Sequence, residues 1–140
     1  MPNEYLVLTG CLCLTIALVE AWMLVISISK PTGMLARSIP GTPDLLRSHI
    51  DYLMMSMFLF IFFGLFIHFR IHPNRTILLS MCIGSIGNPL LFLVRAIRTD
   101  FKAHQPPLLR AAMGLSCIFT TTGYFGGIYF VAAAAAAAIP

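Results

Sequence analysis

Hydrophobic residues form four long runs along the chain, and three short polar segments separate them. Each run is long enough to cross the hydrocarbon core of a bilayer, which is about 30 Å thick and takes roughly 20 helical residues. The pattern predicts helices over residues 5–28, 43–69, 76–97 and 108–138. We therefore expect an all-α fold: an integral membrane four-helix bundle in which residues 1–140 form a single transmembrane domain.

The composition supports a membrane protein. Hydrophobic residues make up 59% of the chain and charged residues only 10%, which leaves too few polar side chains to cover a water-facing surface. The net charge of +4 comes from bases in short loops beside the predicted helices, so we expect lipid headgroups as partners and no nucleic acid. The cysteines lie inside apolar runs without a CxxC pair, which favours neither a zinc site nor a disulfide framework.

The basic residues also predict an orientation. Lys30, Arg37 and Arg47 flank the first loop, Arg95, Arg98, Lys102 and Arg110 flank the third, and only Arg70 and Arg75 belong to the second. By the positive-inside rule, loops 1 and 3 of this multi-pass protein are expected to face the cytoplasm, with both termini outside.

The second helix has a recognisable start. Thr42 is the expected N-cap, Pro43 takes the first helical position, and Asp44 lies in the first turn, where a negative charge meets the positive end of the helix. If the helix begins there, His49 lies about 9 Å along it, at 1.5 Å per residue, and not at the membrane surface.

Polar side chains from different helices fall at a similar depth, measured from the side of loops 1 and 3. At 1.5 Å per residue, Glu20 lies roughly 12–15 Å deep, His49 about 9 Å, Asp51 about 12 Å and Asn88 about 13 Å. Polar groups inside a bilayer are costly and usually face a bundle interior or a cavity. We therefore predict one polar pocket in this half of the membrane, and Tyr52 shares the His49 face of its helix.

His49 and Asp51 point about 160–200° away from each other, so they cannot both face one small ligand unless it lies between subunits or the helix is distorted. Asp51 is expected to pair with a base such as Arg47 or Arg95. For His49, a structural role, a proton relay, and ligation of haem or a metal all remain open.

The fourth helix is rich in glycine, at Gly114, Gly123, Gly126 and Gly127. In lipid, small residues let helices approach closely, so this surface is expected to form either an oligomer contact or a contact inside one subunit.

Three short motifs carry a family resemblance: Pro40-Gly-Thr-Pro-Asp-Leu-Leu-Arg-Ser-His49, then Met54-Met-Ser-Met57, and Gly84-Ser-Ile-Gly-Asn88. Over residues 38–95 the chain resembles the small four-helix membrane family of styrene oxide isomerase and is similar to the hydroxylaminobenzene mutases.

The resemblance implies a homotrimer that carries haem b between subunits, with His49 as the axial iron ligand. It also implies that ferric haem acts as a Lewis acid on an epoxide oxygen, so that the ring opens and a hydride shift gives an aldehyde. Asn88 would then orient the substrate, Met55 would line an edge of the haem, and Arg47 would contact the haem propionates or lipid headgroups.

The chain departs from the isomerase at three positions. Met55 stands where the isomerase has asparagine, Gly84 where it has an acid, and Phe92 where it has tyrosine. Two functions are therefore carried forward: a haem-dependent isomerase of small hydrophobic epoxides or arene metabolites, and a non-catalytic haem-binding or structural small subunit of a membrane complex. A transporter is a weaker choice, because no inverted repeat is visible in the sequence.

Overall fold

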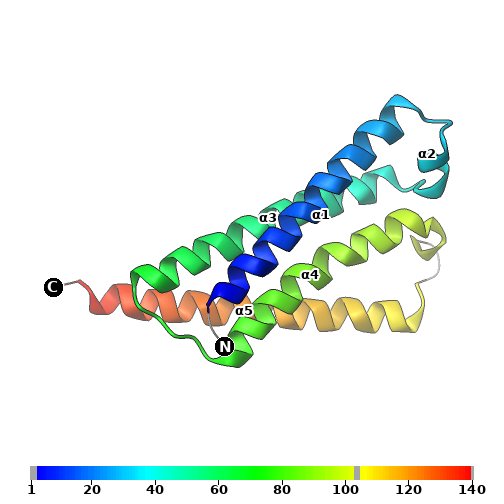
Figure 1. Ribbon diagram of the computed structural model, residues 1–140. Coiled ribbons are helices and arrows are strands. Elements are labelled where there is room, and N and C mark those ends of the chain that lie inside the picture. Colours follow the sequence, from blue (N-terminus) through cyan, green and yellow to red (C-terminus); the bar gives the residue numbers. More distant parts are fainter. Residues whose placement is uncertain (1–2, 103–104, 140) are drawn as a thin grey trace.

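A computed structural model describes residues 3–102 and 105–139, and within these ranges the regular structure is entirely helical (Figure 1). The long helices match the four predicted ranges to within one residue at each end, so the all-α prediction is confirmed. Two short helices in the first and third loops were not predicted. The elements are α1 (Glu4–Ser29), α2 (Met34–Ser38), α3 (Thr42–His68), α4 (Arg75–Ile97), the 3-10 helix η1 (Thr99–Lys102) and α5 (Pro107–Ala137).

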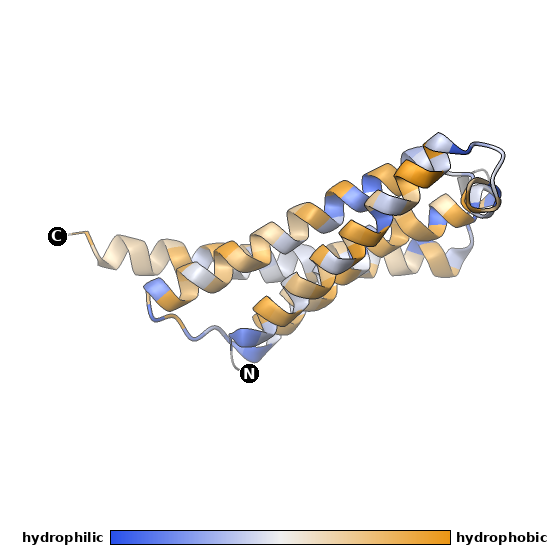
Figure 2. Cartoon of the chain, turned by 45° about the horizontal axis from the view of Figure 1, so that its top comes forward, coloured by the Kyte–Doolittle hydropathy of each residue, from blue (hydrophilic) through white to orange (hydrophobic). Residues whose placement is uncertain are grey.

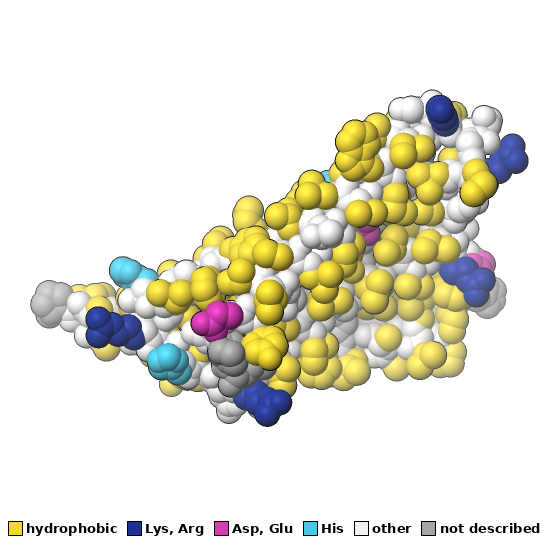
Figure 3. Space-filling view, viewed as in Figure 1, with side chains coloured by type: hydrophobic (Ala, Val, Ile, Leu, Met, Phe, Trp, Pro, Cys, Tyr) yellow, Lys and Arg dark blue, Asp and Glu magenta, His cyan; other side chains and the backbone are white. Residues whose placement is uncertain are grey.

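All four long helices are long and apolar enough to cross a membrane. Hydrophobic residues cover their length, and hydrophilic residues gather mainly toward the two ends of the molecule (Figures 2 and 3). The start of α1, the α3–α4 loop and the end of α5 lie at one end, and α2 and η1 lie at the other (Figure 1). This is the organisation of a multi-pass membrane protein.

The central helices are α3 and α4. They pack on each other, while α1 packs mainly on α3 and α5 mainly on α4. Only four residues of α5 are buried, namely Leu109, Ser116, Gly123 and Gly127. Most of the α5 surface is thus left to face lipid or another protein.

Small and polar residues make up most of the buried face of α1. The buried positions alternate spacings of four and three residues, which is the stripe expected for two long helices packed side by side; they are Leu6, Gly10, Cys13, Ala17, Glu20, Leu24 and Ser27. Larger side chains such as Leu8, Leu18 and Trp22 are exposed. Lipid solvates these large side chains, whereas small residues let α1 approach its neighbours closely.

Glycines bring α4 and α5 into backbone contact. A Cβ atom at Gly84 would lie 2.6 Å from the Thr120 nitrogen, and one at Gly123 would lie 2.5 Å from the Met81 nitrogen. Of the α5 glycines, Gly123, Gly126 and Gly127 all meet groups of the same chain, so packing inside one subunit explains them, whereas Gly114 faces open space.

The predicted N-cap of α3 was wrong by one residue. Gly41 caps the helix, and no side chain makes a capping hydrogen bond, although Pro43 and Asp44 do lie in the first turn as predicted. The Gly41 amide donates to Ala96 O at 2.9 Å. A Cβ at Gly41 would lie 2.6 Å from the Ala96 Cα, so this close contact with the end of α4 fixes where α3 begins, and only glycine fits.

The Gly84 contact predicts the effect of an added methyl group. We expect Gly84→Ala to lower the free energy of unfolding by about 1–3 kcal/mol, because the Cβ must push α4 and α5 apart. Gly64→Ala is the matched control: nothing lies within 4 Å of its Cβ, so the better helix propensity of alanine should leave stability equal or slightly higher. Equal thermal stability of the two variants in detergent would contradict the close α4–α5 contact.

Candidate functional site

Pro89 interrupts the hydrogen bonding of α4 in the middle of its membrane span. It is fully buried inside the helix, and it has no N–H to donate to Ser85 O one turn earlier. A backbone carbonyl without a partner is costly in hydrocarbon, so neighbouring groups must satisfy it.

Side chains from α1 and α3 bind the carbonyls on this face of α4. The contacts join Cys13 Sγ to Ser85 O at 3.8 Å, Tyr52 OH to Ile86 O at 3.3 Å, and Ser48 Oγ to Pro89 O at 3.0 Å. The Ser85 hydroxyl in turn lies 2.7 Å from the Tyr124 hydroxyl on α5. The turn that ends at Pro89 therefore contacts all three other long helices.

Glu20 is part of the same network. Its side chain is 1% exposed, and Oε1 lies 2.7 Å from Ser48 Oγ. Within the described residues, Oε2 has no hydrogen-bond partner. Ser48 carries one hydroxyl proton but lies within bonding distance of both Glu20 Oε1 and Pro89 O, and the backbone carbonyl only accepts. Both contacts are satisfied together when Glu20 is a neutral carboxylic acid that donates to Ser48.

His49 binds α1 through one ring nitrogen. Nδ1 lies 2.9 Å from Ala17 O, and since a carbonyl only accepts, Nδ1 carries the proton. In the neutral ring the lone pair is then on Nε2. Histidines that ligate metals are typically oriented by such a second bond to a backbone carbonyl. The His49 side chain is only partly buried.

Asp51 lies on a different side of α3. Asn88 Nδ2 donates to Asp51 Oδ2 at 3.4 Å, which links α3 to α4, whereas His49 binds α1. The predicted divergence of His49 and Asp51 is thus confirmed.

The expected pairing of Asp51 with a base is wrong. Arg47 reaches back along α3 to Asp44 at 3.4 Å, which draws it away from Asp51. Arg95 lies over the Phe92 ring at 6.0 Å, two helical turns beyond Asn88, and its Nε has no hydrogen-bond partner in the described part of the chain.

The remaining candidates lie on the α5 side of the molecule. Asn88, Phe92 and Arg95 line a cavity of about 40 Å³ between α4 and α5, together with Met113 and Cys117. Met55 lines a separate groove of about 370 Å³ between α3 and α5, with Phe58 and Tyr124 among its neighbours. Within one chain, Met55 and His49 therefore lie on different sides of α3.

Residues predicted to lie at similar depth meet in two places: Glu20 reaches the residue before His49, and Asp51 reaches Asn88. However, these residues form two separate polar clusters, Glu20 with Ser48 and Asp51 with Asn88, where one pocket was predicted. The sequence analysis also missed Ser48 and Pro89. The sequence did contain a clue to these two residues. A proline in the middle of a membrane span leaves a backbone carbonyl without its helical hydrogen bond, so a polar partner nearby is expected.

No family model matches the chain, and neither a curated protein nor a solved structure shows significant similarity to it.

The two contacts of the Ser48 hydroxyl predict how its removal changes the stability of the protein. We expect Ser48→Ala to lower the free energy of unfolding by about 1–3 kcal/mol, because it leaves the buried Glu20 carboxyl group without its partner and removes the side-chain contact from α3 to Pro89 O. Ser38→Ala is the control, since the exposed Ser38 hydroxyl bonds only Met34 O within its own short helix.

Glu20→Gln tests the charge of the buried carboxyl group. Its amide can donate to Ser48 as a neutral acid does, so thermal unfolding in detergent should stay close to that of the wild type. A loss as large as that of Ser48→Ala would instead show that the network requires a carboxylate.

Proposed function

We propose that this chain is an integral membrane protein that binds haem b, with His49 Nε2 as the axial ligand of the iron. The hydrogen bond from His49 Nδ1 to Ala17 O supports the proposal most directly, because it leaves Nε2 with the lone pair that iron requires.

The residues around His49 fit such a group. Within the described residues, no cluster of three or more His, Cys, Asp or Glu side chains could hold a metal ion on its own. Haem iron needs fewer protein ligands, because the porphyrin supplies four ligands and a single histidine can supply the fifth. Leu46 and Leu53, one turn before and after His49, are exposed apolar side chains suited to a porphyrin face.

A second copy of the chain would complete this site. Arg47 and Met55 point away from His49 on α3, so they would contact a haem bound to a neighbouring copy. This accords with the trimer that the family resemblance implies.

The proposed activity is isomerisation of a small hydrophobic epoxide or arene metabolite that partitions into lipid. Bound ferric haem would supply a Lewis acid for the substrate oxygen. Asn88 would hold a substrate oxygen through its amide, which Asp51 orients at 3.4 Å. Since Asn88 lies on α4 and lines the cavity beside α5, away from His49, it would serve a site shared with a neighbouring copy.

A non-catalytic haem-binding subunit is the alternative, and the Gly84 contact favours it. A Cβ at this position would lie 2.6 Å from the Thr120 nitrogen, so the acid that the isomerase has there does not fit between α4 and α5. With Met55 and Phe92 also lacking polar groups, Asn88 would act on the substrate without the isomerase's other polar partners.

The absorption spectrum tests haem binding. Protein expressed with haem available should show a Soret band that His49→Ala loses, because the iron has lost its ligand. His68→Ala is the matched control, an exposed histidine at the other end of α3, and it should keep the band. A colourless wild-type protein, or a band that survives in His49→Ala, would contradict the proposal.

Turnover separates the two functions. Holoprotein incubated with styrene oxide should form phenylacetaldehyde if the chain is an isomerase, and Asn88→Ala should slow this formation by about 10–100-fold through loss of one orienting hydrogen bond. Haem binding without product would favour the non-catalytic subunit.

A further inference from the structure

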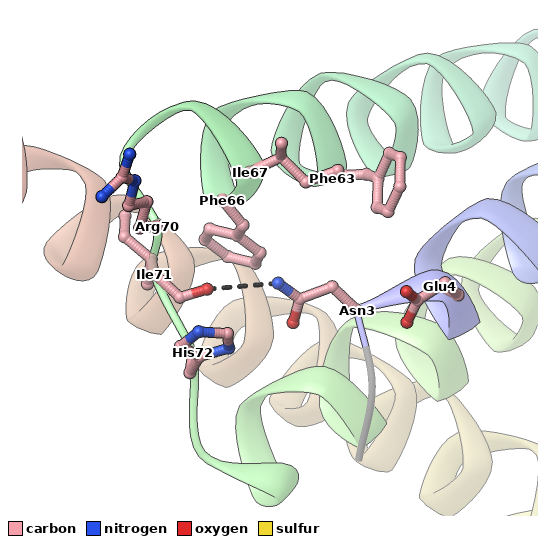
Figure 4. Close-up of a pocket in the computed structure, with 8 residues that line it drawn as sticks. All are labelled: Asn3, Glu4, Phe63, Phe66, Ile67, Arg70, Ile71 and His72. Carbon is pink, nitrogen blue, oxygen red and sulfur yellow. Dashed lines mark hydrogen bonds between the residues drawn. The ribbon is translucent and has the colours of Figure 1, made fainter.

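A pocket of about 470 Å³ lies at the end of the molecule opposite loops 1 and 3 (Figure 4). The start of α1, the last turns of α3 and the loop to α4 enclose it. Its lining is apolar on the α3 side, at Phe63, Phe66 and Ile67, and polar at the helix ends. The pocket therefore begins inside the membrane span and ends at the level of the lipid headgroups.

The polar end is held in place by the backbone. Asn3 Nδ2 donates to Ile71 O at 3.1 Å and so ties the start of α1 to the α3–α4 loop (Figure 4). The end of α3 forms a Schellman motif, in which Ile71 N donates to Phe66 O at 2.7 Å and Arg70 N donates to Ile67 O at 3.1 Å.

Arg70 takes the left-handed position of this motif, with φ of 53°, and it is the one non-glycine residue of the described chain with a positive φ. Glycine is the usual residue here, because a side chain makes this conformation unfavourable. An arginine that adopts this unfavourable conformation marks a candidate functional position. Arg70 lines the pocket at its edge, and its guanidinium is directed outward (Figure 4).

Opposite charges flank the pocket. Arg70 lies on one side with His72 nearby, and Glu4 lies on the other (Figure 4). Among the described residues, neither Arg70 nor Glu4 forms an ion pair. The pocket thus offers a cation for a phosphate, a carboxylate for an ammonium group, and an apolar wall for a hydrocarbon chain.

We propose that this pocket binds a zwitterionic phospholipid with an ammonium headgroup, of the phosphatidylethanolamine type. The phosphate lies at Arg70, the ammonium at Glu4, and one acyl chain runs along Phe63 and Ile67. An anionic lipid fits less well, because Glu4 repels its headgroup. This site is separate from His49 and does not depend on haem.

The test uses delipidated protein in detergent, titrated with short-chain phosphatidylethanolamine or phosphatidylglycerol, and with phosphoethanolamine as the free headgroup. Binding is followed by the shift in unfolding temperature and by lipid adducts in native mass spectrometry. The wild type should be stabilised most by phosphatidylethanolamine and little by the free headgroup, which lacks the acyl chain.

Arg70→Gly separates binding from folding, because its two expected effects have opposite signs. Without lipid, its unfolding temperature should rise, since glycine adopts the left-handed conformation freely. Its binding of phosphatidylethanolamine should weaken about tenfold through the loss of a charge-assisted contact. Arg75→Gln is the matched control, a base in the first turn of α4 outside the pocket lining, and it should bind as the wild type does.

Glu4→Gln tests the choice of headgroup and should bind both lipids alike. Undiminished phosphatidylethanolamine binding by Arg70→Gly would overturn the proposal. Equal stabilisation of the wild type by phosphatidylglycerol, or by the free headgroup, would overturn it as well.

Discussion

Pro89 removes one hydrogen-bond donor from the middle of α4, at a depth where water is not present to replace it. Each of the other three long helices places a side chain against the turn that ends at Pro89. Cys13 from α1 lies against the freed Ser85 carbonyl, and Tyr52 and Ser48 from α3 bind the carbonyls beside it. Since each contact requires close approach, the small residues on the buried face of α1 and the glycines between α4 and α5 serve the same purpose.

The network around Pro89 also sets the position of His49. Ser48 is anchored to both Pro89 O and Glu20, so the next residue of α3 is directed toward the α1 backbone, where Nδ1 meets Ala17 O. The contacts that pack the bundle thus also orient the His49 ring. They leave Nε2 available as a ligand on the membrane-facing side of the helix. Asp51 and Asn88 lie on another side of α3, where they link it to α4.

Much of this architecture could be predicted from the sequence, because a bilayer fixes how long an apolar helix must be. Constant rise per residue also placed Glu20, His49 and Asn88 at one depth. The partners of each side chain could not be predicted, since they depend on helix rotation and contact. Hydrophobicity alone does not reveal that Arg47 turns back to Asp44, that Gly84 touches Thr120, or that Gly41, and not Thr42, caps α3.

The hydrogen bond to Ala17 O should hold His49 in the tautomer that presents Nε2 as a ligand. Nitrogen NMR of ¹⁵N-histidine-labelled, haem-free protein in detergent micelles tests this directly, with His49→Ala used to assign the signals. In the neutral ring, Nδ1 of His49 should carry the proton and Nε2 should not. A proton on Nε2, with Nδ1 unprotonated, would contradict it.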